Sequence, residues 1–167
     1  MKKQTKRLSL LAILTSLALI LSFVESQFPP IYQGVPGVKM GLANIVITFA
    51  LYTLSPLDTI AISLIRVFAV SLLFANALVF TYSLAGAILS FLIMLILKKI
   101  DKFSCVGVSV VGAISHNLGQ ILMAILLLDT IQIGYYMIIL VITGTLAGVI
   151  VGLTASILIK RINKIKF

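Results

Sequence analysis

The sequence predicts an all-α integral membrane protein with about six transmembrane helices and both termini in the cytoplasm. The apolar composition, the length of the apolar segments and the placement of basic residues predict this fold class. Of the 167 residues, 61% are hydrophobic, and the mean hydropathy is +1.25. A soluble domain is roughly 45–50% apolar. Because a span uses about 20 apolar residues, six spans nearly fill residues 1–167, so we expect a single transmembrane domain.

Six apolar segments are separated by turn-forming or charged residues. The expected helices cover residues 8–24, 40–54, 56–74, 82–97, 106–128 and 135–159. The second segment is short for a full span. Residues 25–39 contain three prolines and two glycines, which break helices and predict an outer loop. Ser55 and Pro56 are expected to be the N-cap and first residue of the third helix, and residues 74–81 a short connection.

Basic residues predict the orientation. With the N-terminus inside, 11 of the 13 Lys and Arg residues lie on the cytoplasmic side, in the N-terminal arm, at 98–102 and in the tail after 159. Lys39 lies outside, and Arg66 lies within the third helix. Short loops follow this positive-inside bias, so membrane topology explains the net charge of +9 and nucleic-acid binding is not expected. We expect a multi-pass cell-membrane protein, in the bacterial cytoplasmic membrane.

Arg66 is the one charged residue placed deep in a predicted helix. A charge at that depth costs at least about 2.5–3.5 kcal/mol on insertion scales, so it is expected to face a cavity or a partner. One interpretation is contact with an anion or a substrate cavity. The other is a structural pair with Asp58, Asn44 or backbone carbonyls.

Polar side chains also gather in the fifth predicted helix. His116 and Gln120 are four residues apart and share one face, with Asn117 beside them. A ligand pocket and an interhelical hydrogen-bond network are the two interpretations, and the density of polar groups favours the pocket. The candidate substrate-binding residues are therefore Lys39 at the entrance, Asn44, Arg66, His116, Asn117 and Gln120.

Small residues spaced four apart predict close helix packing. Gly144, Gly148 and Gly152 form such a stripe in the sixth helix, which we expect to serve internal packing rather than dimerisation. Ala12 and Ser16 form a shorter pair of the same spacing in the first helix.

Residue patterns for catalysis are absent from the sequence. There is no phosphate-binding Gly-rich loop, the four acidic residues are scattered, and the single Cys and single His make a poor metal site. We therefore expect no catalytic residues, no metal, no cofactor and no enzymatic activity.

Several motifs resemble a known family. They are Pro36-Gly-Val-Lys-Met-Gly-Leu-Ala-Asn-Ile45, Ser63-Leu-Ile-Arg-Val67, Tyr82-Ser-Leu-Ala-Gly86 and Ser115-His-Asn-Leu-Gly-Gln120. Together they resemble the Gx transporter family, which is also labelled heptaprenyl diphosphate synthase component I, over about Leu8 to Leu153. That family is similar to the substrate-binding S components of energy-coupling factor (ECF) transporters.

The resemblance implies an S-component-like fold and function. S components capture vitamins or other micronutrients from outside, in a pocket covered by the first loop. They work with a transmembrane coupling protein and two cytoplasmic ATPases. Their first helix docks on the coupling protein through an Ala-x-x-x-Ala motif, and Ala12 and Ser16 match its spacing, with Ser in place of the second Ala. The resemblance thus implies an importer subunit, with a flavin as one candidate substrate.

Two other functions compete with this interpretation. The older family label suggests a non-catalytic membrane partner of a prenyl diphosphate synthase in quinone biosynthesis. A stand-alone proton- or ion-coupled carrier is the third hypothesis, and it ranks last because no acidic residue is predicted deep in a helix.

Overall fold

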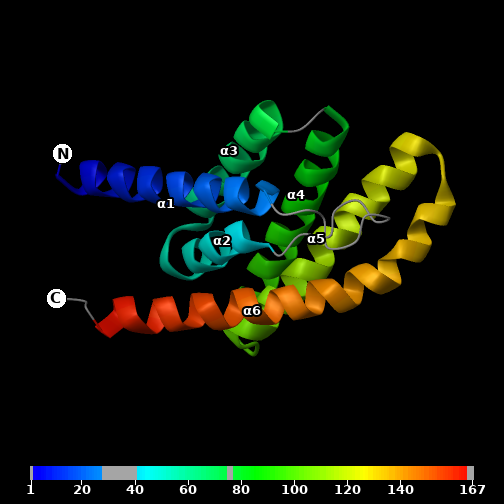
Figure 1. The fold of residues 1–167 in the computed structure, drawn as a ribbon. Helices are drawn as coiled ribbons and strands as arrows, with labels where there is room; N and C mark the ends of the chain where they lie inside the picture. The colour runs from blue at the N-terminus through cyan, green and yellow to red at the C-terminus, as the bar shows by residue number, and fades with distance from the viewer. Residues whose placement is uncertain (1, 28–40, 75–76, 165–167) are drawn as a thin grey trace.

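The computed structural model describes residues 2–27, 41–74 and 77–164. These residues form helices joined by short turns and contain no strand (Figure 1). The helices are α1 (Lys2–Gln27), α2 (Leu42–Thr53), α3 (Pro56–Phe74), α4 (Ala77–Ile100), α5 (Cys105–Leu128), the 3-10 helix η1 (Ile131–Tyr136) and α6 (Met137–Lys164). The predicted all-α fold class is confirmed.

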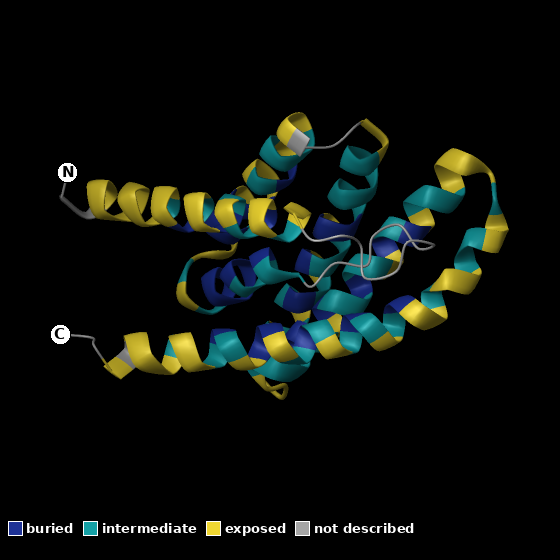
Figure 2. Ribbon diagram, in the orientation of Figure 1, coloured by how far each residue is buried: buried dark blue, intermediate teal, exposed yellow. Residues whose placement is uncertain are grey.

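Among the described residues, five helices are long and apolar enough to cross a membrane, namely α1, α3, α4, α5 and α6. With 12 residues, α2 extends about 18 Å, which is short of the roughly 30 Å hydrocarbon core of a bilayer. Exposed residues follow the outward faces of α1 and α6, whereas buried residues gather in α2 and where helices meet (Figure 2). Many exposed side chains are large and apolar, such as Leu126 and Ile138, as expected of surfaces that face lipid.

Three tertiary contacts show that the first four helices alternate in direction. Arg7 near the start of α1 forms an ion pair with Asp58 in the first turn of α3. Lys98 near the end of α4 donates from Nζ to the carbonyl of Leu51 near the end of α2. At the opposite side, the end of α1 meets the residue that precedes α2 through Glu25. Because α6 also ends on the side where α1 starts (Figure 1), the two described ends of the chain lie on the same side of the bundle.

The helices pack in two groups. In the first group, α4 packs against α5 and α5 packs against α6; in the second group, α1 packs against α2 and α3. In the second group, Leu14 and Ala18 of α1 are buried against Val46 and Ala50 of α2 and Ile62 of α3. The two groups meet where α2 contacts α6 and α3 contacts α4.

The helix bounds differ from the predicted ones at several ends. The expected connection over residues 74–81 is wrong, because α4 already begins at Ala77 and residues 77–81 contain neither Gly nor Pro to break a helix. The first helix continues through polar residues at both ends, so the predicted 8–24 becomes α1. The last helix extends past the predicted end at 159 to Lys164, but it begins at Met137, because residues 135 and 136 belong to η1. Residues 25–27 belong to α1, and the rest of the predicted outer loop lies outside the described residues.

The start of α3 confirms the predicted cap and corrects one predicted pair. Ser55 Oγ accepts a hydrogen bond from the backbone N–H of Asp58 at 3.2 Å and donates to Asp58 Oδ2 at 2.9 Å. The Arg7 guanidinium binds both carboxylate oxygens of Asp58, with Nε 3.1 Å from Oδ2. The alternative that Arg66 pairs with Asp58 is therefore wrong, because α1 supplies the partner of this carboxylate.

The glycine stripe of α6 packs against α5, as predicted. A Cβ atom on Gly148 would lie 2.6 Å from Val110 Cα, and one on Gly152 would lie 2.7 Å from Val106 Cα. Both neighbours are backbone atoms of α5, so the two helices approach as closely as their backbones allow.

Replacing Ser104 with alanine is expected to destabilise the start of α5. Ser104 is the N-cap of α5, and its Oγ accepts from the backbone N–H of Gly107 at 3.1 Å. Loss of such a cap costs about 1 kcal/mol. Thermal unfolding in detergent should show a lower midpoint for Ser104→Ala and a midpoint near wild type for Ser104→Asp, which retains an acceptor. Equal midpoints for the alanine variant and wild type would contradict this role.

Candidate functional site

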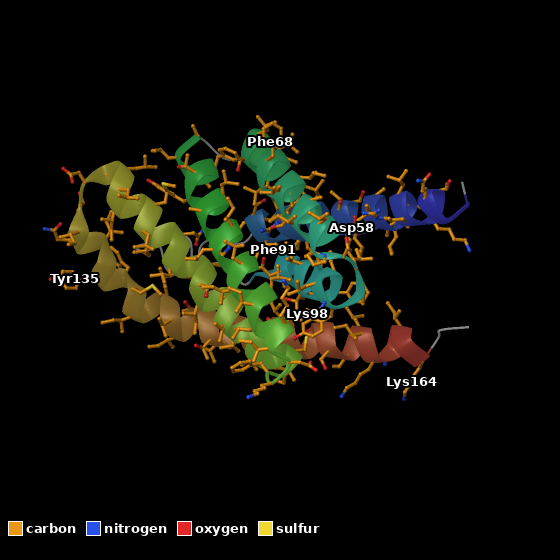
Figure 3. All side chains as sticks on the ribbon, turned by 180° about the vertical axis from the view of Figure 1, so that it is seen from behind. Asp58, Phe68, Phe91, Lys98, Tyr135 and Lys164 are labelled. Carbon is orange, nitrogen blue, oxygen red and sulfur yellow. The ribbon has the colours of Figure 1, made fainter. Side chains whose placement is uncertain are left out.

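A cavity of about 90 Å³ lies inside the helix bundle. Every helix from α1 to α6 contributes to its wall. Phe91 of α4, labelled near the middle of Figure 3, belongs to this wall. The charged and amide-bearing or imidazole side chains that line it are Glu25, Asn44, Arg66, His116, Asn117 and Gln120.

The cavity brings together five of the six residues that the sequence singles out. Asn44 comes from α2, Arg66 from α3, and His116, Asn117 and Gln120 from one face of α5. Arg66 and His116 therefore line the same cavity. Lys39, expected at the entrance, lies outside the described residues.

Arg66 brings a positive charge to the cavity wall. Its Nε atom is buried and has no hydrogen-bond partner among the described residues. A buried donor left without an acceptor costs about 1–3 kcal/mol. An acceptor supplied by water or by a ligand would remove this cost, so Arg66 Nε is available to donate a hydrogen bond to an oxygen atom.

Glu25 places a carboxylate near Arg66, and the two interact electrostatically. Glu25 lies in the last turn of α1, and its Oε1 accepts from the backbone N–H of Gly41 at 2.5 Å. Gly41 has a positive φ of 72° directly before α2, a conformation that favours glycine. Glu25 is not among the six residues selected from the sequence, because its hydrogen bond with Gly41 and its interaction with Arg66 are tertiary.

The amide side chains of the cavity divide into two groups. Asn117 Nδ2 donates to the carbonyl of Leu140 in α6 at 2.9 Å, so the hydrogen-bond network interpretation holds for this residue. A Cβ on Gly144 would lie 2.8 Å from that Nδ2, so the absent side chain makes room for the contact. In contrast, Asn44 and Gln120 form no side-chain hydrogen bond within the described part of the chain.

Hydroxyl groups also line the cavity, beside apolar side chains such as Phe91 and Met94, and were missed by sequence reasoning. They are Thr48, Ser63, Ser90 and Ser109. Along α5 the cavity wall extends from Gln120 to Ser109, about 16 Å at 1.5 Å per residue. Ser109, Gly112, His116 and Gln120 follow one another by three or four residues, so helical periodicity could have extended the predicted face to Ser109.

Two further observations concern the predicted docking residues and metal binding. Ala12 and Ser16 lie on the exposed face of α1, where a second helix could approach. Within the described ranges, no three His, Cys, Asp or Glu side chains gather in a way that could hold a metal ion.

These features define the class of protein: a multi-pass helical membrane protein whose helices surround a small cavity lined by both polar and apolar side chains. Residues 14–158 match the model of the family described as heptaprenyl diphosphate synthase component I. Because the match covers most of the chain, the protein belongs to this family. No curated protein and no solved structure matches the chain.

Proposed function

We propose that this chain is the substrate-binding membrane subunit, or S component, of an ECF-type importer for a vitamin-like micronutrient. The observation that carries the proposal is the cavity, whose wall includes Asn44, Gln120 and Arg66, and in which the buried Nε of Arg66 has no hydrogen-bond partner among the described residues. Polar groups inside a membrane protein are costly and usually serve a substrate path or binding site. A concave site with a few convergent polar groups is the usual form of a small-molecule site.

The partners of such a subunit would supply the energy. The sequence has no phosphate-binding loop, so ATP hydrolysis would come from two cytoplasmic ATPases, joined through a transmembrane coupling protein. Ala12 and Ser16 on the exposed face of α1 are the proposed docking residues, because small side chains let a partner helix approach closely. The chain itself would bind and reorient substrate, with no catalytic role.

The size of the cavity bears on the substrate. Pockets for drug-sized ligands measure roughly 300–1,000 Å³, whereas this cavity measures about 90 Å³. Compact polar compounds are therefore favoured. A flavin remains a candidate only with a widening of the cavity.

The family description supports a second candidate function, a non-catalytic membrane partner of a prenyl diphosphate synthase. In that function the basic residues near the ends of α4 and α6, such as Lys99 and Lys164, would contact the soluble enzyme. It assigns no ligand to the cavity.

Native mass spectrometry of the protein, extracted from its own membrane into lipid nanodiscs, tests the proposed function. We expect a one-to-one complex with a small molecule, which remains in the Ser16→Leu variant because Ser16 lies on the exposed face of α1, away from the cavity wall. A protein free of small molecules, even after incubation with a protein-free cell extract, would refute substrate capture.

A further inference from the structure

Resting on the proposed function, we propose that the ligand of this cavity carries no net charge, and that it bridges Arg66 and Glu25. A hydrogen-bond acceptor of the ligand binds the Arg66 guanidinium, and a donor binds the Glu25 carboxylate. The ligand class is a compact zwitterion or a neutral polar compound.

The charges of the cavity wall support this class. Among the described residues that line the cavity, Arg66 is the one Lys or Arg and Glu25 the one Asp or Glu. The formal charges of Arg66 and Glu25 cancel, and the two side chains, from α3 and α1, interact electrostatically. A ligand with a net charge would therefore leave an uncompensated charge in a poorly solvated site, which is strongly unfavourable.

The unused hydrogen-bonding capacity of Arg66 and Glu25 indicates which polar groups the ligand carries. Arg66 Nε is buried without an acceptor among the described residues, so an acceptor of the ligand belongs there. A carboxylate offers about four lone-pair sites, and the recorded hydrogen bond of Glu25 is the one from the Gly41 N–H. Glu25 thus retains capacity for a ligand donor.

The neighbouring amides fit the same class. The side chains of Asn44 and Gln120 each carry a carbonyl acceptor and an amino donor, and neither side-chain amide forms a hydrogen bond with another described residue. Such groups recognise uncharged polar edges without favouring either sign of charge. A diphosphate, in contrast, carries several negative charges, for which the described cavity wall offers the single guanidinium of Arg66.

Equilibrium dialysis against a defined probe mixture tests this inference. The mixture contains the standard L-amino acids, riboflavin, riboflavin 5′-phosphate and isopentenyl diphosphate, added to a protein-free cell extract. Wild-type protein in nanodiscs is compared with Glu25→Gln and Arg66→Gln, and retained compounds are identified by mass spectrometry. Glu25→Gln is a matched variant, because its amide oxygen can still accept from the Gly41 N–H while the negative charge is lost.

We expect wild type to retain a neutral or zwitterionic compound, and each variant to bind it at least about tenfold more weakly, as loss of a hydrogen bond to a charged group implies. Retention of an anion such as riboflavin 5′-phosphate or isopentenyl diphosphate would overturn the inference and leave substrate capture intact. Retention of a neutral compound with unchanged affinity in both variants would also overturn it. Retention of no compound would overturn the proposed function itself.

Discussion

Replacing Arg66 with glutamine is expected to weaken ligand binding by about 10- to 100-fold or more, since hydrogen bonds to charged groups are worth about 1.5–3 kcal/mol. The same change removes no hydrogen bond of Nε to the described residues and leaves the Glu25–Gly41 bond in place. It also removes the charge that offsets Glu25, so we expect the protein to fold with a lower unfolding midpoint. The dissociation constant of the retained compound and the thermal unfolding midpoint, measured on one preparation, separate the two effects.

A matched control uses the same substitution in the exposed tail. Arg161→Gln changes an exposed residue near the end of α6 and should bind like wild type. Arg66→Lys keeps the charge without the planar fork of donors and should recover only part of the affinity. Wild-type affinity in Arg66→Gln would show that the guanidinium does not contact the ligand.

Replacing Gly148 with alanine is expected to destabilise the protein by about 1–3 kcal/mol, the usual cost of overpacking. The added Cβ would lie 2.6 Å from Val110 Cα and 3.1 Å from the Ser109 carbonyl oxygen. Because these are backbone atoms, α5 and α6 must move apart. Since Ser109 and Gly148 both line the cavity, ligand affinity should fall as well.

Gly107→Ala is the matched control for this change. Its added Cβ would lie 3.5 Å from Ser104 Oγ, an ordinary contact, and alanine favours a helix by up to about 1 kcal/mol relative to glycine. Thermal unfolding in detergent should therefore give a lowered midpoint for Gly148→Ala and an equal or raised one for Gly107→Ala. Equal midpoints for the two variants would contradict the close packing of α5 on α6.

The fold class was predictable because a bilayer demands long apolar helices, and apolar segments are visible in the sequence. Helix ends were less predictable, since residues 77–81 lack a helix breaker and α4 extends through them. The ion pair of Asp58 could not be predicted from its neighbours in the sequence, because its partner Arg7 lies 51 residues away in another helix.

Some residues of the candidate site were predictable from the sequence, and others were not. Helical spacing predicted that His116 and Gln120 share a face of α5 with Asn117 beside them. The cost of a buried charge predicted that Arg66 faces either a cavity or a partner, and the structure places it in the cavity wall. Glu25 was missed, because its contacts arise only when the end of α1 meets the start of α2. The role of Asn117 as a link to Leu140 also depends on how α5 and α6 pack, which spacing within one helix does not reveal.

The most direct test of the importer function is recovery of the tagged protein from its native membrane in mild detergent, with proteomic identification of its partners. The proposed function predicts recovery of a transmembrane coupling protein together with paired ATPases, and loss of both in a variant that carries Ala12→Leu and Ser16→Leu on the exposed face of α1. Recovery of a soluble prenyl diphosphate synthase without those ATPases would contradict the importer function and support the second candidate.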